Sequence, residues 1–311
     1  MTFNKRGEKL SAWLRIARFQ FYPMAFIAYS LGTAAAFITS HTFSLPVFFL
    51  GYAVLFLIEF CTILTNEYHD YGTDCLNSNF SLFTGGTRIL VEGRLKFSEI
   101  KVGIAAALFL ITLSGYLLIQ INQKASPFTT LLILLSGIIL GLGYTAPPLK
   151  FSYRGVGEIV VGITHSTYLI LCGYAFQTGT LNHPLPWLLS IPLFFSVLAA
   201  ITLAGLPDRL ADSAVSKKTM AVIFGPETAI VMAACFVCIS ALSGWIIWYL
   251  KLKWWVLVLS TIVLPSHGLI LLWSLYRLFR SNNYDRRING VMASSLTYII
   301  WFGLIPLISL I

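Results

Sequence analysis

A polar run at the end of a long apolar stretch contains the side chains best suited to chemistry. Asn66, Asp70 and Asp74 are spaced four residues apart, so on a helix they point the same way within about 80°. Far downstream, Asp208 and Asp212 repeat this spacing at the end of another apolar stretch. Carboxylate oxygens suit Mg²⁺, which commonly completes its coordination shell with water and substrate phosphates. The two acidic clusters therefore predict a site for divalent cations and a polyphosphate.

One further acidic residue, Glu59, lies inside the apolar stretch that precedes the first cluster. Glu59, Asn66 and Asp70 fall within about 40° of one helical face, and Glu59 is expected roughly 10 Å deeper than Asn66. Two interpretations stay open, since an ionisable residue inside a membrane span is commonly functional. Glu59 is either a functional carboxylate or a protonated side chain that is hydrogen-bonded to a neighbouring helix.

Basic residues near the clusters are candidates for binding an anion. In the segment 75–100, Gly85 and Gly86 precede Arg88, so backbone N–H groups and a guanidinium can face a phosphate; a flexible turn is the alternative interpretation. Arg18 lies at the boundary of the first expected span, where it either snorkels to lipid headgroups or binds an anionic substrate. Further basic candidates follow the apolar stretches: Lys150, Arg154, Lys217 and Lys218.

The composition identifies the class of protein that must position these residues. The chain is 57% hydrophobic and 11% charged, with a mean hydropathy of +0.81. These values exclude a soluble domain and predict an all-α, polytopic membrane protein in which residues 1–311 form one domain. We expect about nine helices around a central cavity that opens at the cytoplasmic face. The expected spans are 20–38, 44–66, 102–121, 127–146, 156–176, 186–206, 220–248, 254–276 and 290–310.

The charges of the connecting segments predict the orientation. Eighteen of the 21 Lys and Arg residues fall on one side of the expected spans, and Lys124, Lys251 and Lys253 fall on the other. The positive-inside rule therefore places the N-terminus in the cytoplasm and the C-terminus outside. The net charge of +9 reflects this asymmetry and favours anionic lipid, not nucleic acid. Residues 1–18, basic and mildly amphipathic, are expected to form an interfacial segment.

His165 and His69 are the histidines closest to these candidates. His165 lies in the span expected at 156–176, seven residues after Glu158 and on the same helical face. We interpret it as an interhelical hydrogen-bonding residue rather than a catalytic base. His69 falls within the first acidic cluster.

Four motifs carry a family resemblance: NExxDxxxD from Asn66, GGTRxLxxG from Gly85, YTAPPLKxxYRGxGE from Tyr144, and PDxxADxxxxKKTxAVxFG from Pro207. Together they resemble the UbiA superfamily of intramembrane aromatic prenyltransferases, over the whole chain. Residues 144–158 and 217–225 resemble most the branch that prenylates 1,4-dihydroxy-2-naphthoate in menaquinone synthesis. The chain departs from the usual motifs at Glu67, where Asp is common, and at Leu206-Pro207, where Asn or Asp often stands.

The resemblance implies a Mg²⁺-dependent transfer from a polyprenyl diphosphate to an aromatic acceptor in a bacterial plasma membrane. Asn66, Asp70 and Asp74 would hold one Mg²⁺, Asp208 and Asp212 would hold a second, and both ions would bridge the diphosphate. The isoprenoid tail would lie among apolar helices that open laterally to lipid. Further roles are expected for the diphosphate contacts Arg88, Lys150 and Lys218, for the acceptor carboxylate partners Arg18 and Arg154, for the ring contact Tyr144, and for the bases Glu59 and His69.

Three other functions are weighed. Within the superfamily, 4-hydroxybenzoate is the main rival acceptor. A secondary transporter would also have a polar midplane and broken helices, but the acidic residues cluster at one face here and form no relay through the membrane. A nonenzymatic membrane scaffold predicts no loss of function when the aspartates are replaced by alanine.

Overall fold

The computed structural model describes residues 2–252, 254–284 and 288–311, and every element within these ranges is helical. Lys253, Arg286 and Arg287, which entered the charge count above, lie outside the described residues. The elements are α1 (Thr2–Ala17), η1 (Phe19–Phe21), α2 (Tyr22–Ser40), α3 (Leu45–His69), α4 (Tyr71–Leu76), α5 (Phe97–Ile121), α6 (Pro127–Leu142), η2 (Phe151–Tyr153), α7 (Gly157–Ile163), the π-helical η3 (Thr164–Tyr168), α8 (Leu169–Thr178), α9 (Pro184–Ala214), α10 (Met220–Ile223), α11 (Pro226–Lys251), α12 (Trp254–Ser281) and α13 (Asn289–Leu310).

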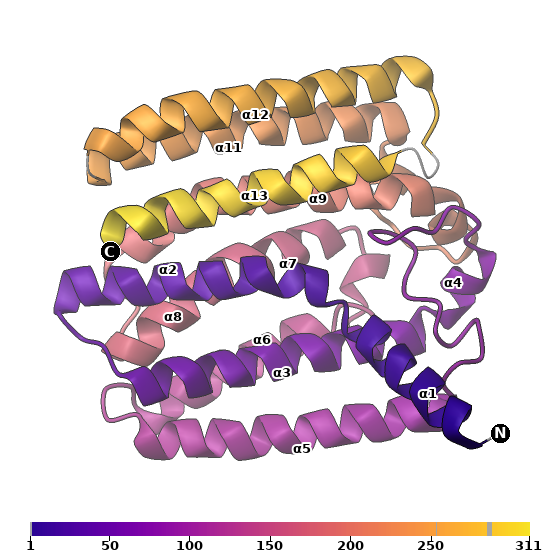
Figure 1. Ribbon diagram of the computed structural model, residues 1–311, viewed down its shortest axis with the longest axis horizontal. Coiled ribbons are helices and arrows are strands. Elements are labelled where there is room, and N and C mark those ends of the chain that lie inside the picture. Colours follow the sequence, from indigo (N-terminus) through magenta and orange to yellow (C-terminus); the bar gives the residue numbers. More distant parts are fainter. Residues whose placement is uncertain (1, 253, 285–287) are drawn as a thin grey trace.

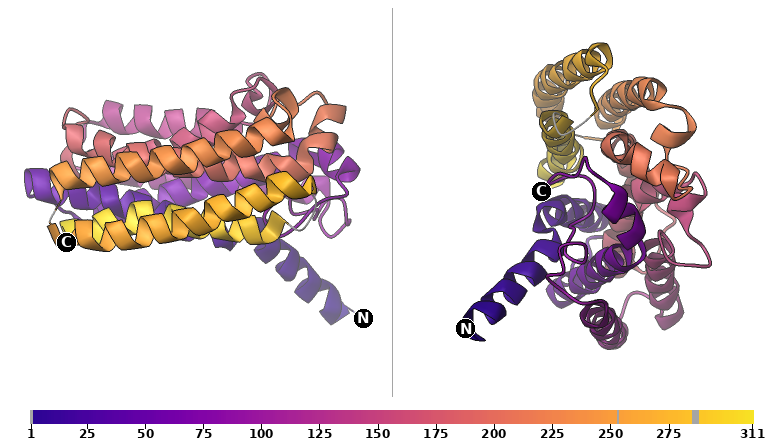
Figure 2. Two further views of the ribbon diagram at one scale, coloured as in Figure 1. Left: turned by 90° about the horizontal axis from the view of Figure 1, so that it is seen from above. Right: turned by 90° about the vertical axis from the view of Figure 1, so that its right-hand side faces the viewer.

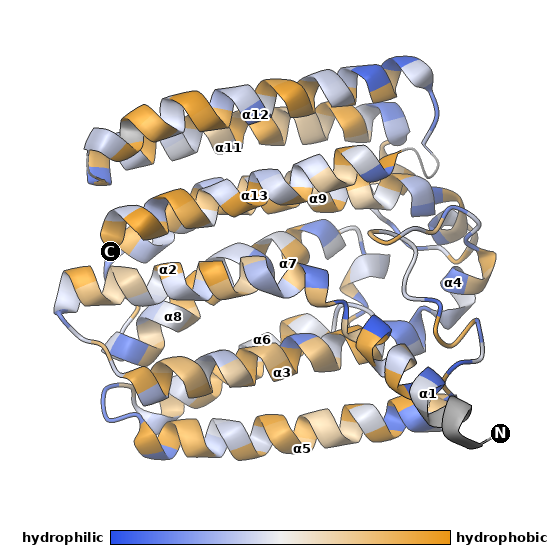
Figure 3. Ribbon diagram, viewed as in Figure 1, coloured by the Kyte–Doolittle hydropathy of each residue, from blue (hydrophilic) through white to orange (hydrophobic). Residues whose placement is uncertain are grey.

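The long helices lie side by side in one bundle, with the N-terminus and the C-terminus at opposite ends (Figure 1). Figure 2 shows that α1 projects away from the bundle at the N-terminal end. The hydropathy colouring in Figure 3 is mostly apolar along the helices, and hydrophilic residues gather at the end that carries α4. Such a distribution suits a bundle whose apolar length lies in hydrocarbon and whose polar end faces water.

Eight helices of the described chain are long and apolar enough to cross a membrane, and the first of them runs from Gly7 to Ser40. The span expected at 127–146 corresponds to α6, which has only 16 residues. At 1.5 Å per residue this helix is about 24 Å long, shorter than the hydrocarbon core of a typical bilayer. The count of nine therefore holds only if α6 is included, and the orientation of the bundle stays a prediction.

Prolines in the first turn mark the start of five long helices: α2, α3, α6, α9 and α11. Proline fits there because the first N–H groups of a helix have no intrahelical partner to lose. At α6, Ser126 also accepts a hydrogen bond from the Thr129 N–H at 3.0 Å. The start of each helix therefore has a local chemical cause in the sequence.

Glycines allow α2 and α8 to pack backbone against backbone. A Cβ at Gly32 would lie 1.9 Å from the carbonyl oxygen of Ile170, and a Cβ at Gly173 would lie 2.1 Å from that of Tyr29. Small residues at helix contacts of this kind are typical of membrane bundles. This close contact fixes α8, and with it the π-helical η3 that immediately precedes it, against α2.

The second acidic cluster lies on a helix and not in the segment that follows one. The span expected at 186–206 ends at Ala214 in the structure, because α9 continues through Pro207. Proline removes one backbone hydrogen bond, which a membrane helix tolerates when neighbouring helices satisfy the freed groups. Asp208 and Asp212 are consequently presented on the last turns of a rigid helix.

Candidate active site

The structure brings the two acidic clusters to one cavity of about 600 Å³. Apart from these polar groups, much of its lining consists of apolar side chains from α3, α9 and α13, such as Ile58, Val197 and Leu296. The predicted residues that line it are Arg18, Glu59, Asn66, Asp70, Asp74, Tyr144, Asp208 and Asp212. Arg88, Lys150, Arg154, Lys218 and His69 are not among the lining residues.

Lys217 connects the two clusters. Its Nζ lies 2.9 Å from Asp70 Oδ2 and 3.7 Å from Asp212 Oδ1, and its side chain is buried. Burial lowers the pKa of the Lys217 ammonium, but Asp70 and Asp212 raise it by more, so that its pKa lies above the usual value. Lys217 is therefore a fixed positive charge between the clusters, whereas Lys218, the lysine expected to contact the diphosphate, is exposed.

The glycine-containing loop after α4 contacts the aspartates directly. The Gly85 N–H donates to Asp208 Oδ2 at 3.2 Å, and Asn77 Nδ2 donates to Asp208 Oδ1 at 2.8 Å. A Cβ on Gly86, whose φ is +68°, would lie 2.3 Å from Asp74 Oδ2. The loop therefore needs glycine because its backbone packs against both clusters, and one of its N–H groups already has a carboxylate partner.

Arg88 holds this loop in place from outside the cavity lining. Its Nη1 donates to the carbonyl oxygens of Asp74, at 2.6 Å, and Asn77, at 3.1 Å. The guanidinium also lies 4.3 Å from the centroid of the Phe80 ring, which is a cation–π contact. Its Nη1 thus binds carbonyl oxygens at the end of α4, and the guanidinium lies outside the cavity lining where a diphosphate contact was expected.

Glu67, which stands where the resemblance leads one to expect Asp, anchors the same loop to α3. Its buried carboxylate accepts from Thr87 Oγ1 at 2.7 Å and from the Ile89 N–H at 2.9 Å. Both oxygens of this carboxylate therefore have hydrogen-bond partners in the loop. The sequence shows only that residue 67 is acidic. It does not show the hydrogen-bond partners, which lie twenty or more residues further along the chain.

The remaining predicted cations have partners elsewhere. Lys150 Nζ lies 4.9 Å from the centroid of the Tyr153 ring, and Arg154 Nη2 donates to the Pro148 carbonyl oxygen at 2.8 Å. The Tyr153 hydroxyl donates to Asp70 Oδ1 at 3.4 Å, so this ring lies between Lys150 and the first cluster. His69 is exposed and packs edge-on against Tyr68.

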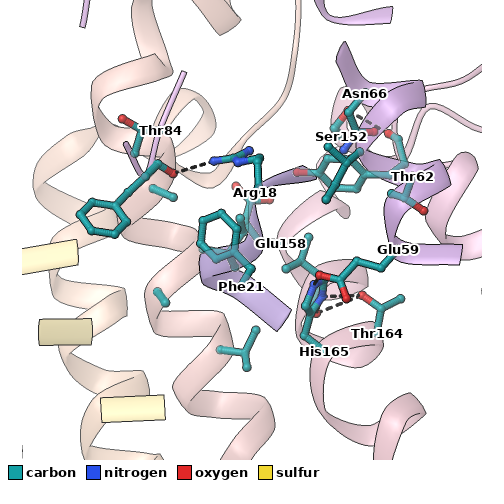
Figure 4. Close-up of a pocket in the computed structure, with 18 of the residues that line it drawn as sticks. Arg18, Phe21, Glu59, Thr62, Asn66, Thr84, Ser152, Glu158, Thr164 and His165 are labelled. Carbon is teal, nitrogen blue, oxygen red and sulfur yellow. Dashed lines mark hydrogen bonds and ion pairs between the residues drawn. The ribbon is translucent and has the colours of Figure 1, made fainter. Parts of the chain in front are cut away.

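Arg18 does face the cavity (Figure 4). Its backbone is in the left-handed region with φ of 53°, its Nη2 donates to the Phe83 carbonyl oxygen at 3.3 Å, and its guanidinium lies 4.8 Å from the Phe21 ring centroid. Only one of its donors is used by these contacts, which leaves the others for a ligand.

Deeper in the cavity, Glu59 of α3 faces His165 of η3 (Figure 4). His165 Nε2 lies 3.9 Å from Glu59 Oε1. The histidine therefore lies near an ionisable group of another helix, but the expected interhelical hydrogen bond is not formed, since its hydrogen-bond partners are Thr164 and Val161 of its own segment. The π-helical turn is the local feature that places it there, and such turns are frequent at functional sites.

The clusters have the properties of a site for a divalent cation bound together with a phosphate. Burial and the carboxylates of Glu67 and Asp70 raise the pKa of Asp74 to about 8. The positive charge near this carboxylate is therefore too small to favour its ionised form. Among the described residues, no ion pair reaches Asp74 or Asp208, and no closed group of three metal-ligating His, Cys, Asp or Glu side chains is found. Mg²⁺, which keeps water and phosphate ligands, fits such an open set of oxygens.

Comparisons with known proteins bear on the family and on the fold. The profile of the UbiA prenyltransferase family matches residues 25–296. The 1,4-dihydroxy-2-naphthoate octaprenyltransferase of Escherichia coli (strain K12) is 25% identical over 303 residues, covering 94% of this chain and 95% of that protein. The enzyme of the same name from Bacillus subtilis (strain 168) is 28% identical over 177 residues, covering 57% of this chain and 54% of that protein.

A solved structure has the same fold. It is that of a UbiA homolog from Archaeoglobus fulgidus bound to GPP and Mg²⁺, with a TM-score of 0.63 and 19% sequence identity. The match covers 95% of this chain and 99% of that chain, so the likeness extends over the whole bundle.

Proposed function

Because the chain belongs to the UbiA prenyltransferase family, we propose that it transfers a polyprenyl group from a polyprenyl diphosphate to 1,4-dihydroxy-2-naphthoate in a Mg²⁺-dependent reaction. That it is an integral membrane prenyltransferase follows from the family and from its apolar helices. The observation that carries the finer proposal is the meeting of both acidic clusters at one cavity with apolar walls. Such a cavity suits a substrate with a charged head and a hydrocarbon tail.

The acidic clusters would hold Mg²⁺ against the diphosphate through Asn66, Asp70, Asp74, Asp208 and Asp212, with two ions as the resemblance implies. When bound, Mg²⁺ supplies positive charge opposite the oxygen on which negative charge develops as the allylic C–O bond breaks. Lys217 adds a fixed ammonium at the same place, already oriented by Asp70 and Asp212. The binding of GPP and Mg²⁺ by the archaeal homolog supports this assignment.

The protein positions this end of the site through a network of hydrogen bonds. Glu67 and Arg88 hold the loop that donates a backbone N–H to Asp208. Glu158 accepts from the Met220 N–H at 2.6 Å, which fixes the segment just after Lys217. Side chains held in this way lose little freedom on binding, so more of the interaction energy is available to the transition state.

The acceptor would enter beside Arg18. A carboxylate on an aromatic ring needs a cationic partner, and Arg18 lines the cavity with unused donors, whereas Arg154 lies outside the lining. Tyr144 lines the same cavity and offers an aromatic ring. The choice of 1,4-dihydroxy-2-naphthoate is supported by the names of the two bacterial relatives and by the motifs at 144–158 and 217–225.

The location proposed for the enzyme is a bacterial plasma membrane, with this end of the bundle at the cytoplasmic face. The asymmetry of basic residues supports the orientation, since the expected spans put 18 of the 21 on the side of the acidic clusters. A cytoplasmic face would give the site direct access to Mg²⁺ and a water-soluble acceptor. The same basic residues, together with the projecting α1, would contact anionic lipid.

A competition assay tests the choice of acceptor. The purified chain receives equal concentrations of 1,4-dihydroxy-2-naphthoate and 4-hydroxybenzoate with one polyprenyl diphosphate, and the products are separated and identified by mass. We expect the prenylated naphthalene to dominate, because the Escherichia coli relative named for the naphthoate matches 94% of this chain. Prenylated 4-hydroxybenzoate as the dominant product would overturn the acceptor while leaving the proposed metal chemistry in place.

A further inference from the structure

Glu59 and His165 form a polar pair in a part of the cavity where a hydrocarbon tail alone would need none. Glu59 is seven residues before Asn66 on the same helix, so it lies about 10 Å from it along the helix axis. Burying ionisable groups inside a membrane bundle is costly, and such groups commonly mark a functional path. Arg18, the proposed partner of the acceptor carboxylate, lines the same cavity as Glu59 and His165.

The hydrogen bonds of His165 indicate which ring nitrogen carries a proton. Nδ1 lies 3.3 Å from the Val161 carbonyl oxygen and 3.1 Å from Thr164 Oγ1, and that hydroxyl lies 2.9 Å from the Val160 carbonyl oxygen, to which it donates. Carbonyl oxygens only accept, so the contact with Val161 favours the tautomer in which Nδ1 carries the proton. Nε2 then has a free lone pair when the ring is neutral, and this is the nitrogen that faces Glu59.

Few other titratable groups face the pair. Tyr52 from α3 and Tyr22 from α2 lie within electrostatic range of Glu59. The Tyr22 hydroxyl is buried without a hydrogen-bond partner among the described residues, and the Tyr52 hydroxyl donates to the Tyr22 carbonyl oxygen. Each of these phenols is a much weaker acid than a carboxyl group or an imidazolium, so each keeps its own proton near neutral pH. Of these four residues, Glu59 and His165 are therefore the ones that can accept a proton.

We propose that Glu59 and His165 contact the hydroxyl of the aromatic acceptor and take the proton that the acceptor loses. This assignment rests on the proposed function. A ring carbon forms a bond to C1 of the prenyl group, the C1–O bond breaks with its electron pair leaving on the diphosphate, and one proton leaves the acceptor. That proton is bound by His165 Nε2, with Glu59 stabilising the resulting imidazolium, and then passes to water.

The test uses the full chain in lipid nanodiscs with Mg²⁺, a prenyl diphosphate and the naphthoate acceptor. Glu59→Gln and His165→Gln preserve size and hydrogen bonding but remove the basic group. We expect transfer to fall by about 10²–10⁴-fold in each, with the affinity for the prenyl diphosphate unchanged. The wild-type rate should rise with pH as the pair loses its proton, and both variants should lack this rise. Glu59→Asp, which retains a carboxylate, should keep more activity than Glu59→Gln.

Matched controls lie outside the cavity. Glu227→Gln removes a carboxylate that accepts from the Tyr284 hydroxyl, and His267→Gln removes a histidine within a span that accepts from Trp301 Nε1. Both should transfer at the wild-type rate.

The possible failures are distinguishable. Wild-type rates and an unchanged pH profile in Glu59→Gln and His165→Gln would overturn the assignment alone. A parallel loss of donor affinity and transfer would also overturn it, because the pair would then serve the donor or the fold. A wild-type chain that transfers no prenyl group to any acceptor would overturn the proposed function together with this assignment.

Discussion

Replacing Asp208 by asparagine is expected to lower prenyl transfer by at least ~10²-fold without unfolding the protein. Asn77 and the Gly85 N–H both donate to the Asp208 carboxylate, and an asparagine oxygen still accepts one of these bonds. The change therefore removes the negative charge and one ligand for Mg²⁺ while keeping the shape of the side chain. Asp70→Asn should have the same effect in the first cluster. The measurement is steady-state transfer at a saturating concentration of Mg²⁺.

The control for these variants is Glu92→Gln. Glu92 pairs with Arg15 at 3.0 Å and with Arg94 at 2.8 Å, outside the cavity lining. Ion pairs this exposed contribute little, about 0–1 kcal/mol, so transfer should stay at the wild-type rate. If Asp70→Asn and Asp208→Asn transferred as fast as Glu92→Gln, the acidic clusters would have no role in the chemistry.

The two adjacent lysines should differ sharply when each is replaced by methionine. Lys217→Met removes the buried ammonium that pairs with Asp70 and Asp212, whereas Lys218→Met changes an exposed side chain. Removing one partner of a buried ion pair typically costs about 3–5 kcal/mol of folding free energy, because the remaining charges are left uncompensated. We therefore expect Lys217→Met to lower the unfolding temperature in the absence of Mg²⁺ and to reduce transfer by ~10-fold or more.

Added Mg²⁺ should restore part of the stability of Lys217→Met, since the cation supplies charge to the same carboxylates. Thermal unfolding in detergent, with and without Mg²⁺, measures this directly, and Lys218→Met should behave as the wild type in both conditions. Equal effects of the two substitutions, or a larger effect of Lys218→Met, would contradict the placement of Lys217 between the clusters.

Hydropathy and spacing were sufficient to predict the bundle and the two acidic clusters. Runs of about 20 apolar residues locate the helices, and the four-residue spacing of Asp208 and Asp212 places that pair on one face of α9. The expectation of one shared helix was wrong for the first cluster, because α3 ends at His69, α4 begins at Tyr71, and Asp70 lies between them. The cavity that both pairs line confirms that they share one end of the bundle. Local periodicity and the cost of charge in hydrocarbon determine these features, and both are readable from a single sequence.

The sequence did not show which of two neighbouring residues would face the cavity. Lys217 and Lys218 are adjacent in a turn, and the Lys217 N–H that donates to the Asp212 carbonyl oxygen at 2.9 Å helps to determine which of them faces inward. The roles of Glu67 and Arg88 depend on a loop that returns to α3 and α4, which is a tertiary contact. For His165, the sequence suggested the face of Glu158, but the π-helical turn alters the helical register and directs the ring toward Glu59.

The most direct test of the central claim is prenyl transfer by the purified wild-type chain with and without a chelator. A polyprenyl diphosphate and 1,4-dihydroxy-2-naphthoate are supplied together, and prenylated product and released diphosphate are measured in the same reaction. We predict that both form in equal amounts in Mg²⁺, that both are abolished by EDTA, and that excess Mg²⁺ restores them. Undiminished product in the presence of EDTA would contradict the account, because the carboxylates that line the cavity would then have no cation to hold against the diphosphate.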